Sequence, residues 1–113
     1  MIYIGFWTEK CNADSLTIEF LKNIKNKKVF LFGTAGYGES EKYFANIINN
    51  VKKNIDKSNT IIGEFMCQGK MPLSVRERYE KMKVENLIRN FDKALSHPDQ
   101  TDLKKLEEII KNI

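Results

Sequence analysis

Residues 28–40, KVFLFGTAGYGES, join an apolar segment directly to a run of glycines and small residues. The first part is rich in β-branched and aromatic side chains, a composition typical of a buried strand. Gly33, Gly36 and Gly38 allow another molecule to approach the backbone closely and direct amide groups towards it. Because a helical pattern starts at Ser40, the segment predicts a strand, a glycine-rich loop and a helix in succession.

The same alternation extends in both directions from this segment. Apolar strands are predicted at residues 2–7 and 60–66, and amphipathic helices at residues 13–25 and 40–55. Each strand is too apolar to leave one face in water. We therefore expect a parallel sheet built from right-handed strand-helix-strand units.

Two helices are predicted at the C-terminal end. Ser74 and Glu77 have the spacing of a capping box at the start of the first, which has an irregularity near Lys83. Pro98 interrupts the helical pattern, and Thr101 is the expected N-cap of the last helix.

These elements predict one α/β domain over residues 1–113. It would have three layers in the order α/β/α, a parallel sheet of about three strands and two C-terminal helices, with those helices covering one sheet face.

Composition narrows the class of protein. The chain has 113 residues, of which 42% are hydrophobic, and no segment approaches the about 20 consecutive apolar residues that cross a bilayer. Without a signal-peptide pattern at the start, we expect a cytoplasmic protein whose two cysteines are free thiols. The single histidine argues against a nitrogen-rich metal site, so we predict no metal.

The net charge of +4 raises the possibility of nucleic-acid binding. However, the lysine clusters at residues 22–28 and 52–57 lie at the ends of predicted helices, where cations complement the helix dipole. No basic strand carries the aromatic residues that stack on bases. Nucleic acid is therefore not the favoured partner.

The candidate site lies in the loops that follow the strands, since ligands of open parallel sheets bind beyond the carboxyl ends of strands. Trp7 and Tyr37 follow two of the strands, so two flat aromatic side chains are placed to flank one crevice and a flat ligand. The glycine-rich loop matches neither a P-loop nor a dinucleotide fingerprint. A tight turn would explain its glycines equally well, and Trp7 in the core or Tyr37 in an ordinary loop remain alternatives.

Several segments of the chain resemble the flavodoxin-like FMN proteins, particularly the bacterial flavodoxin family domains. The matching segments cover nearly the whole chain and are residues 4–7 (IGFW), Ala13-Asp14, residues 30–36 (FLFGTAG), residues 63–71 (GEFMCQGKM) and His97-Pro98. The resemblance implies an FMN-binding protein in which the flavin performs redox chemistry and transfers electrons to or from a redox partner. It also implies that the ring lies between two loops near a cysteine, with a cofactor site formed by Phe6, Trp7, Thr8, Thr34, Ala35, Gly36, Tyr37, Gly38 and Cys67.

The resemblance extends only to strands 3, 4 and 5 of the family's five-stranded sheet. The Ser/Thr-rich phosphate loop that the family places after strand 1 is not matched, and the strand from Ile2 to Trp7 becomes an edge. We expect that edge to be covered, either in a homodimer that pairs two such strands antiparallel or by a partner chain that supplies the missing strands. The alternative function is a truncated flavodoxin-like domain without cofactor that serves as an interaction or assembly module.

Overall fold

A four-stranded sheet in the order β2-β1-β3-β4 organises the chain, of which the computed structural model describes residues 1–36 and 41–113. The three long strands, β1 (Ile2–Glu9), β3 (Lys28–Ala35) and β4 (Thr60–Gln68), run parallel to one another. The predicted α/β class and parallel sheet are therefore confirmed.

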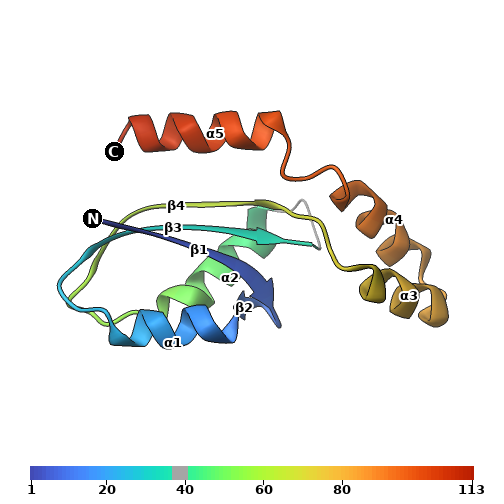
Figure 1. The fold of residues 1–113 in the computed structure, drawn as a ribbon, viewed down its shortest axis with the longest axis horizontal. Coiled ribbons are helices and arrows are strands. Elements are labelled where there is room, and N and C mark those ends of the chain that lie inside the picture. Colours follow the sequence, from blue (N-terminus) through green and yellow to red (C-terminus); the bar gives the residue numbers. More distant parts are fainter. Residues whose placement is uncertain (37–40) are drawn as a thin grey trace.

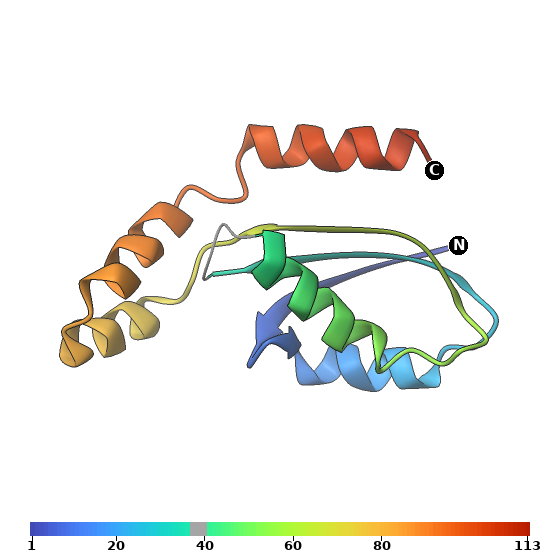
Figure 2. The same cartoon turned by 180° about the vertical axis from the view of Figure 1, so that it is seen from behind.

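The helices form layers on either side of this sheet. Helices α1 (Ser15–Asn23) and α2 (Glu41–Lys52) lie against one face, and α5 (Gln100–Lys111) lies over the other (Figures 1 and 2). Helices α3 (Leu73–Met82) and α4 (Glu85–Ala94) pack on each other beyond the carboxyl ends of the strands. Only α5 covers the second face, which corrects the expectation that all of the C-terminal helical region would do so.

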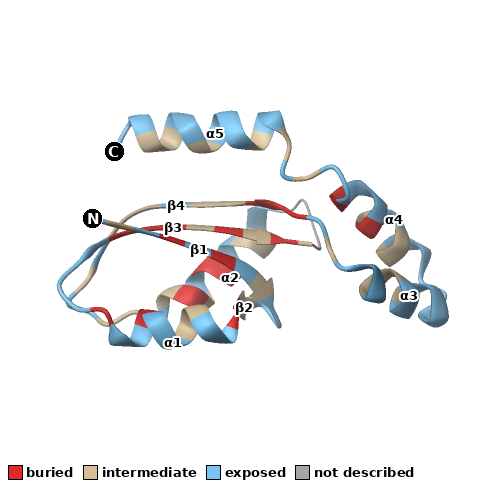
Figure 3. Cartoon of the chain, in the orientation of Figure 1, coloured by how far each residue is buried: buried red, intermediate tan, exposed pale blue. Residues whose placement is uncertain are grey.

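The hydrophobic core lies between the sheet and the helices α1 and α2. Its residues come from alternate positions of β1 and β3 and from both helices, and the buried positions are red in Figure 3. They include Ile4, Phe6, Leu21, Val29, Leu31, Ile47 and Val51. The spacing of these residues is two along the strands and three or four along the helices, as the sequence pattern predicts.

Strand β1 is buried on one face only, contrary to the prediction. Ile4 and Phe6 point into the core, whereas Tyr3 and Trp7 on the opposite face are 52% and 55% exposed. Helix α5 packs over β4, the strand at the opposite edge of the sheet, and leaves β1 uncovered. The described core therefore buries the apolar side chains on only one face of β1.

The C-terminal region has three helices instead of two. Lys83 adopts a left-handed conformation with φ 55°, so the expected irregularity is a complete break between α3 and α4. The capping predictions were wrong: Pro72 occupies the N-cap of α3, and Asp99 instead of Thr101 caps α5. Asp99 precedes Thr101 by two residues and pairs with Asp102 in a reciprocal capping box.

A short hairpin follows β1 and was not predicted. Lys10 and Cys11 have φ values of 49° and 62°, and the chain returns as β2 (Asn12–Ala13), which pairs antiparallel with Thr8 and Glu9. Positive φ at both central residues is the signature of a type I′ turn, which usually contains Asn or Gly.

No described helix is long and apolar enough to cross a membrane.

Candidate functional site

The candidate site is a cleft at the carboxyl ends of β1 and β3, here called the strand-end cleft. The parallel register places Trp7 beside Thr34, so both strands end at the same edge of the sheet. The cleft has a volume of about 330 Å³ and is lined by Trp7, Thr8, Thr34, Gly36, Gly69, Lys70, Met71 and Pro72. Its position agrees with the general rule for ligand binding in open parallel sheets.

The loop after β1 is fixed at its base by a buried aspartate. Asp14 is 2% exposed, and its carboxylate accepts hydrogen bonds from the Trp7 amide at 3.4 Å and from the Thr17 amide at 3.2 Å. The second of these bonds caps α1. The Thr8 hydroxyl donates to the Thr34 carbonyl at 2.9 Å, which ties this loop to β3. The hydrogen bonds of Asp14 and of Thr8 hold this wall of the cleft in place.

Trp7 forms the exposed aromatic wall of the cleft. Its indole N–H donates to the Glu9 carboxylate at 3.1 Å, which restricts rotation of the ring. A half-exposed indole held in one orientation is a surface on which a flat ligand can stack.

The end of β3 approaches the segment after β4 very closely. A side chain at Gly36 would collide with Met71, and a Cβ at Gly69 would lie 2.7 Å from the Thr34 Cβ. Close packing therefore favours glycine at both positions. The sequence pattern alone could not distinguish this reason from a tight turn.

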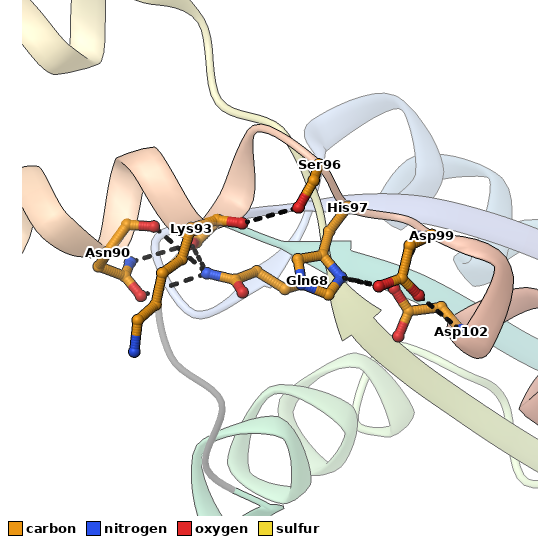
Figure 4. Close-up of polar contacts among 8 residues, drawn as sticks. Gln68, Asn90, Lys93, Ser96, His97, Asp99 and Asp102 are labelled. Carbon is orange, nitrogen blue, oxygen red and sulfur yellow. Dashed lines mark hydrogen bonds and ion pairs between the residues drawn. The ribbon is translucent and has the colours of Figure 1, made fainter.

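Two side-chain amides bind the carbonyl of Gly36. Gln68 donates to it through Nε2 at 3.1 Å, and Asn90 of α4 donates through Nδ2 at 3.0 Å. Gln68 Nε2 also lies 3.2 Å from the Asn90 Oδ1, so the two amides contact each other (Figure 4). Sequence reasoning missed both residues: Gln68 lies within the quoted GEFMCQGKM segment, whereas no local pattern distinguishes Asn90.

A second cavity of about 370 Å³ lies between the sheet and α5, here called the apolar cavity. Its lining includes Phe32, Phe65, Leu103 and Leu106, together with Trp7 and Thr34, which it shares with the strand-end cleft. Cys67 also borders this cavity and is 7% exposed. Burial, with smaller contributions from Asp102 and Asp99, raises the pKa of the Cys67 thiol to about 11. The thiol is therefore protonated at neutral pH.

A polar cluster at the start of α5 lies beside Cys67. His97 Nδ1 is 2.7 Å from Asp102 Oδ2, and that carboxylate also accepts the Asp99 amide at 2.9 Å (Figure 4). Burial acts to raise the pKa of Asp102, but the hydrogen bonds from His97 and Asp99 outweigh it and lower the pKa. Ligand-type atoms of His97, Asp99 and Asp102 all lie within 4.8 Å of one another. The capping box of α5 accounts for the positions of both carboxylates.

The structure brings together part of the predicted site. Four of the predicted residues line the strand-end cleft: Trp7, Thr8, Thr34 and Gly36. Phe6 and Ala35 are buried in the core, and Phe6 also borders the apolar cavity with Cys67. Tyr37 and Gly38 lie outside the described residues.

Comparison with known proteins identifies relatives of this chain. The flavodoxin-like domain-containing protein BilS of Clostridioides difficile is 32% identical over 121 residues, which cover 100% of this chain and 69% of that protein. Its namesake in Clostridium symbiosum is 35% identical, over 97% of this chain and 65% of the relative. An uncharacterized protein of Methanocaldococcus jannaschii is 32% identical over 84% of this chain and 56% of its own length. The chain thus spans about two thirds of the two BilS proteins.

Residues 1–111 match the flavodoxin domain family. The match includes the strand-end cleft and every described helix, and it ends with the last residue of α5. The chain therefore belongs to the flavodoxin domain family.

Proposed function

We propose that this chain is an FMN-binding redox protein that carries electrons and whose flavin site is completed by a second copy or a partner chain. The supporting observation is the strand-end cleft, in which an exposed indole and a glycine-bounded wall meet at the carboxyl ends of two parallel strands. Bound FMN would supply the electron-transfer chemistry, and the chain would hold the ring and restrict its contact with water.

The residues of the cleft fit the ring of FMN. Trp7 offers a flat face, Gly36 lines the cleft beside it, and Thr8 and Thr34 are already tied to each other. Lys70 is the cation among the described lining residues and is suited to a phosphate. One cation is a sparse phosphate site, which is the reason for proposing that another chain completes it.

Titration of FMN with the purified chain tests this function. We expect the fluorescence of FMN to be quenched as it enters the cleft, and the affinity to fall about three- to tenfold in Trp7→Ala because one aromatic stacking contact is lost. Trp7→Phe keeps an aromatic face and serves as the matched control. Unquenched fluorescence at every protein concentration, together with a colourless preparation, would exclude FMN binding by this chain alone.

The alternative is a cofactor-free interaction or assembly module. It is favoured by the uncovered apolar side chains Tyr3, Trp7 and Leu103, which are 52%, 55% and 51% exposed. Stoichiometric FMN binding would exclude this alternative.

A further inference from the structure

The carbonyl of Gly36 is the last described backbone group before the glycine-rich loop. Gln68 at the end of β4 and Asn90 in the middle of α4 both donate to it, at 3.1 and 3.0 Å. A glycine restricts its own backbone less than any other residue, so the orientation of the Gly36 carbonyl depends on the groups that bind it. The two amide donors supply that orientation from outside the loop.

The burial of Gln68 has an energetic cost, because one of its polar atoms has no hydrogen-bond partner among the described residues. The side chain is 4% exposed, and its Oε1 atom is buried without a hydrogen-bond donor among the described residues. A buried acceptor without a partner costs about 1–3 kcal/mol, whereas methionine would fill a similar volume without that cost. The hydrogen bonds of the other amide atom, Nε2, are therefore the feature that distinguishes Gln68 from an apolar residue at this position.

Further contacts connect the same region to the strand-end cleft. The Gly69 amide donates to the Ala35 carbonyl at 3.1 Å, which extends the pairing of β3 and β4 by one residue. Met71 packs so closely on Gly36 that a side chain there would force Met71 to move. The Gly36 peptide is thus held by hydrogen bonds on one side and by a side chain on the other, at the wall of the proposed flavin site.

We propose that Gln68 and Asn90 are positioning residues, which hold the Gly36 carbonyl and so fix the wall of the strand-end cleft against which the flavin ring would lie. This inference rests on the proposed FMN function and makes α4, which does not line the cleft, a part of the binding machinery. Asn90 acts by donating Nδ2 to Gly36 and by presenting Oδ1 to Gln68, so that the two amides orient each other.

The variant Asn90→Asp tests the proposal because it removes one donor and preserves size. The carboxylate still accepts from Gln68 but repels the Gly36 carbonyl. We expect the Kd for FMN to rise about tenfold, which corresponds to the loss of one hydrogen bond, and the visible circular dichroism of bound FMN to change. Asn86→Asp is the matched control, since it introduces the same charge at an exposed position of the same helix.

A second variant addresses the possibility that Asn90→Asp does not fold. Gln68→Met removes both the donor to Gly36 and the unpartnered acceptor, so it should unfold at an unchanged or higher urea concentration while the Kd for FMN rises. A merely structural role for Gln68 would instead lower the unfolding midpoint and leave the dichroism of bound FMN unchanged.

The outcomes separate the proposal from the function on which it rests. If wild type binds FMN and folded Asn90→Asp and Gln68→Met bind it with the affinity and dichroism of wild type, the positioning role is refuted and the FMN function stands. If wild type does not bind FMN, the positioning role and FMN binding by this chain alone are both refuted. Weaker binding in the two variants, with Asn86→Asp unchanged, supports the positioning role.

Discussion

At the scale of single residues, the two cysteines illustrate how position determines reactivity. Cys11 is exposed in the hairpin after β1, whereas Cys67 is buried and carries a pKa of about 11, against an ordinary value of 9.0. At pH 8 this shift lowers the thiolate fraction of Cys67 about 100-fold, and the thiolate is the reactive form.

We therefore predict two phases in the reaction of the native protein with Ellman's reagent. Cys11 should react at the rate of an accessible thiol, and Cys67 at least about 100-fold more slowly, until denaturant makes the two equivalent. Cys11→Ala should remove the fast phase and Cys67→Ala the slow one. Equal rates for both thiols in the folded protein would contradict the burial of Cys67.

At the scale of elements, the start of α5 is stabilised by groups that titrate. The pKa of Asp102 is lowered from 3.8, because hydrogen bonds from His97 and Asp99 to its carboxylate outweigh the effect of burial. A carboxyl group whose pKa is lower in the folded state contributes stability above its unfolded pKa and loses it as pH falls through the folded pKa.

Asp102→Asn should therefore reduce the free energy of unfolding most at neutral pH. The difference from wild type should shrink below about pH 4 as Asp102 becomes protonated. Urea unfolding at a series of pH values measures this difference. Glu107→Gln, at an exposed position of the same helix, is the control and should show no comparable dependence; a difference that grows towards low pH would contradict the assignment.

The same element shows which features of the structure the sequence could predict. The strands and the helices α1 and α2 were predictable because their apolar residues repeat at periods that propensity and burial both favour. The cap of α5 was not, because Asp99, Thr101 and Asp102 are all acceptable capping residues and the pattern alone does not choose among them. The break at Lys83 was visible only as an irregularity, since a left-handed lysine has no sequence signature comparable to that of glycine.

The candidate site was predictable to the extent that it follows from strand ends. Trp7, Thr8, Thr34 and Gly36 lie together because parallel strands end at one edge, a rule that needs no knowledge of tertiary contacts. Asn90 reaches Gly36 across 54 positions of sequence, and the packing of α4 that permits it has no local signal. Phe6 and Ala35 belong to the site that the family resemblance implies, and the alternation of side chains along a strand places both of them in the core.

At the scale of the whole molecule, the sheet has one long edge whose apolar composition is not explained by the chain itself. Among the described residues, β2 pairs with β1 only at Thr8 and Glu9, whereas residues 2–7 are paired with β3 alone. The face of β1 that points away from the core is also uncovered, with Tyr3 half exposed. Natural proteins usually protect such an edge with charges, prolines or a covering segment, and residues 2–7 contain none of the first two.

We therefore expect the edge to associate with a second copy by antiparallel pairing of β1 about a two-fold axis, which would join two sheets into one. Light scattering after chromatography should give twice the 13.2 kDa of one chain at micromolar concentration and a lower mass on dilution. Tyr3→Lys should shift the equilibrium towards the monomer, because a lysine on an edge strand opposes pairing and is brought near its counterpart by the two-fold axis. Leu16→Lys is the control, since it adds the same charge at an exposed position of α1 away from the edge. A mass of one chain at every concentration would refute pairing with a second copy, whereas a dimer unaffected by Tyr3→Lys but dissociated by Leu16→Lys would place the interface on α1.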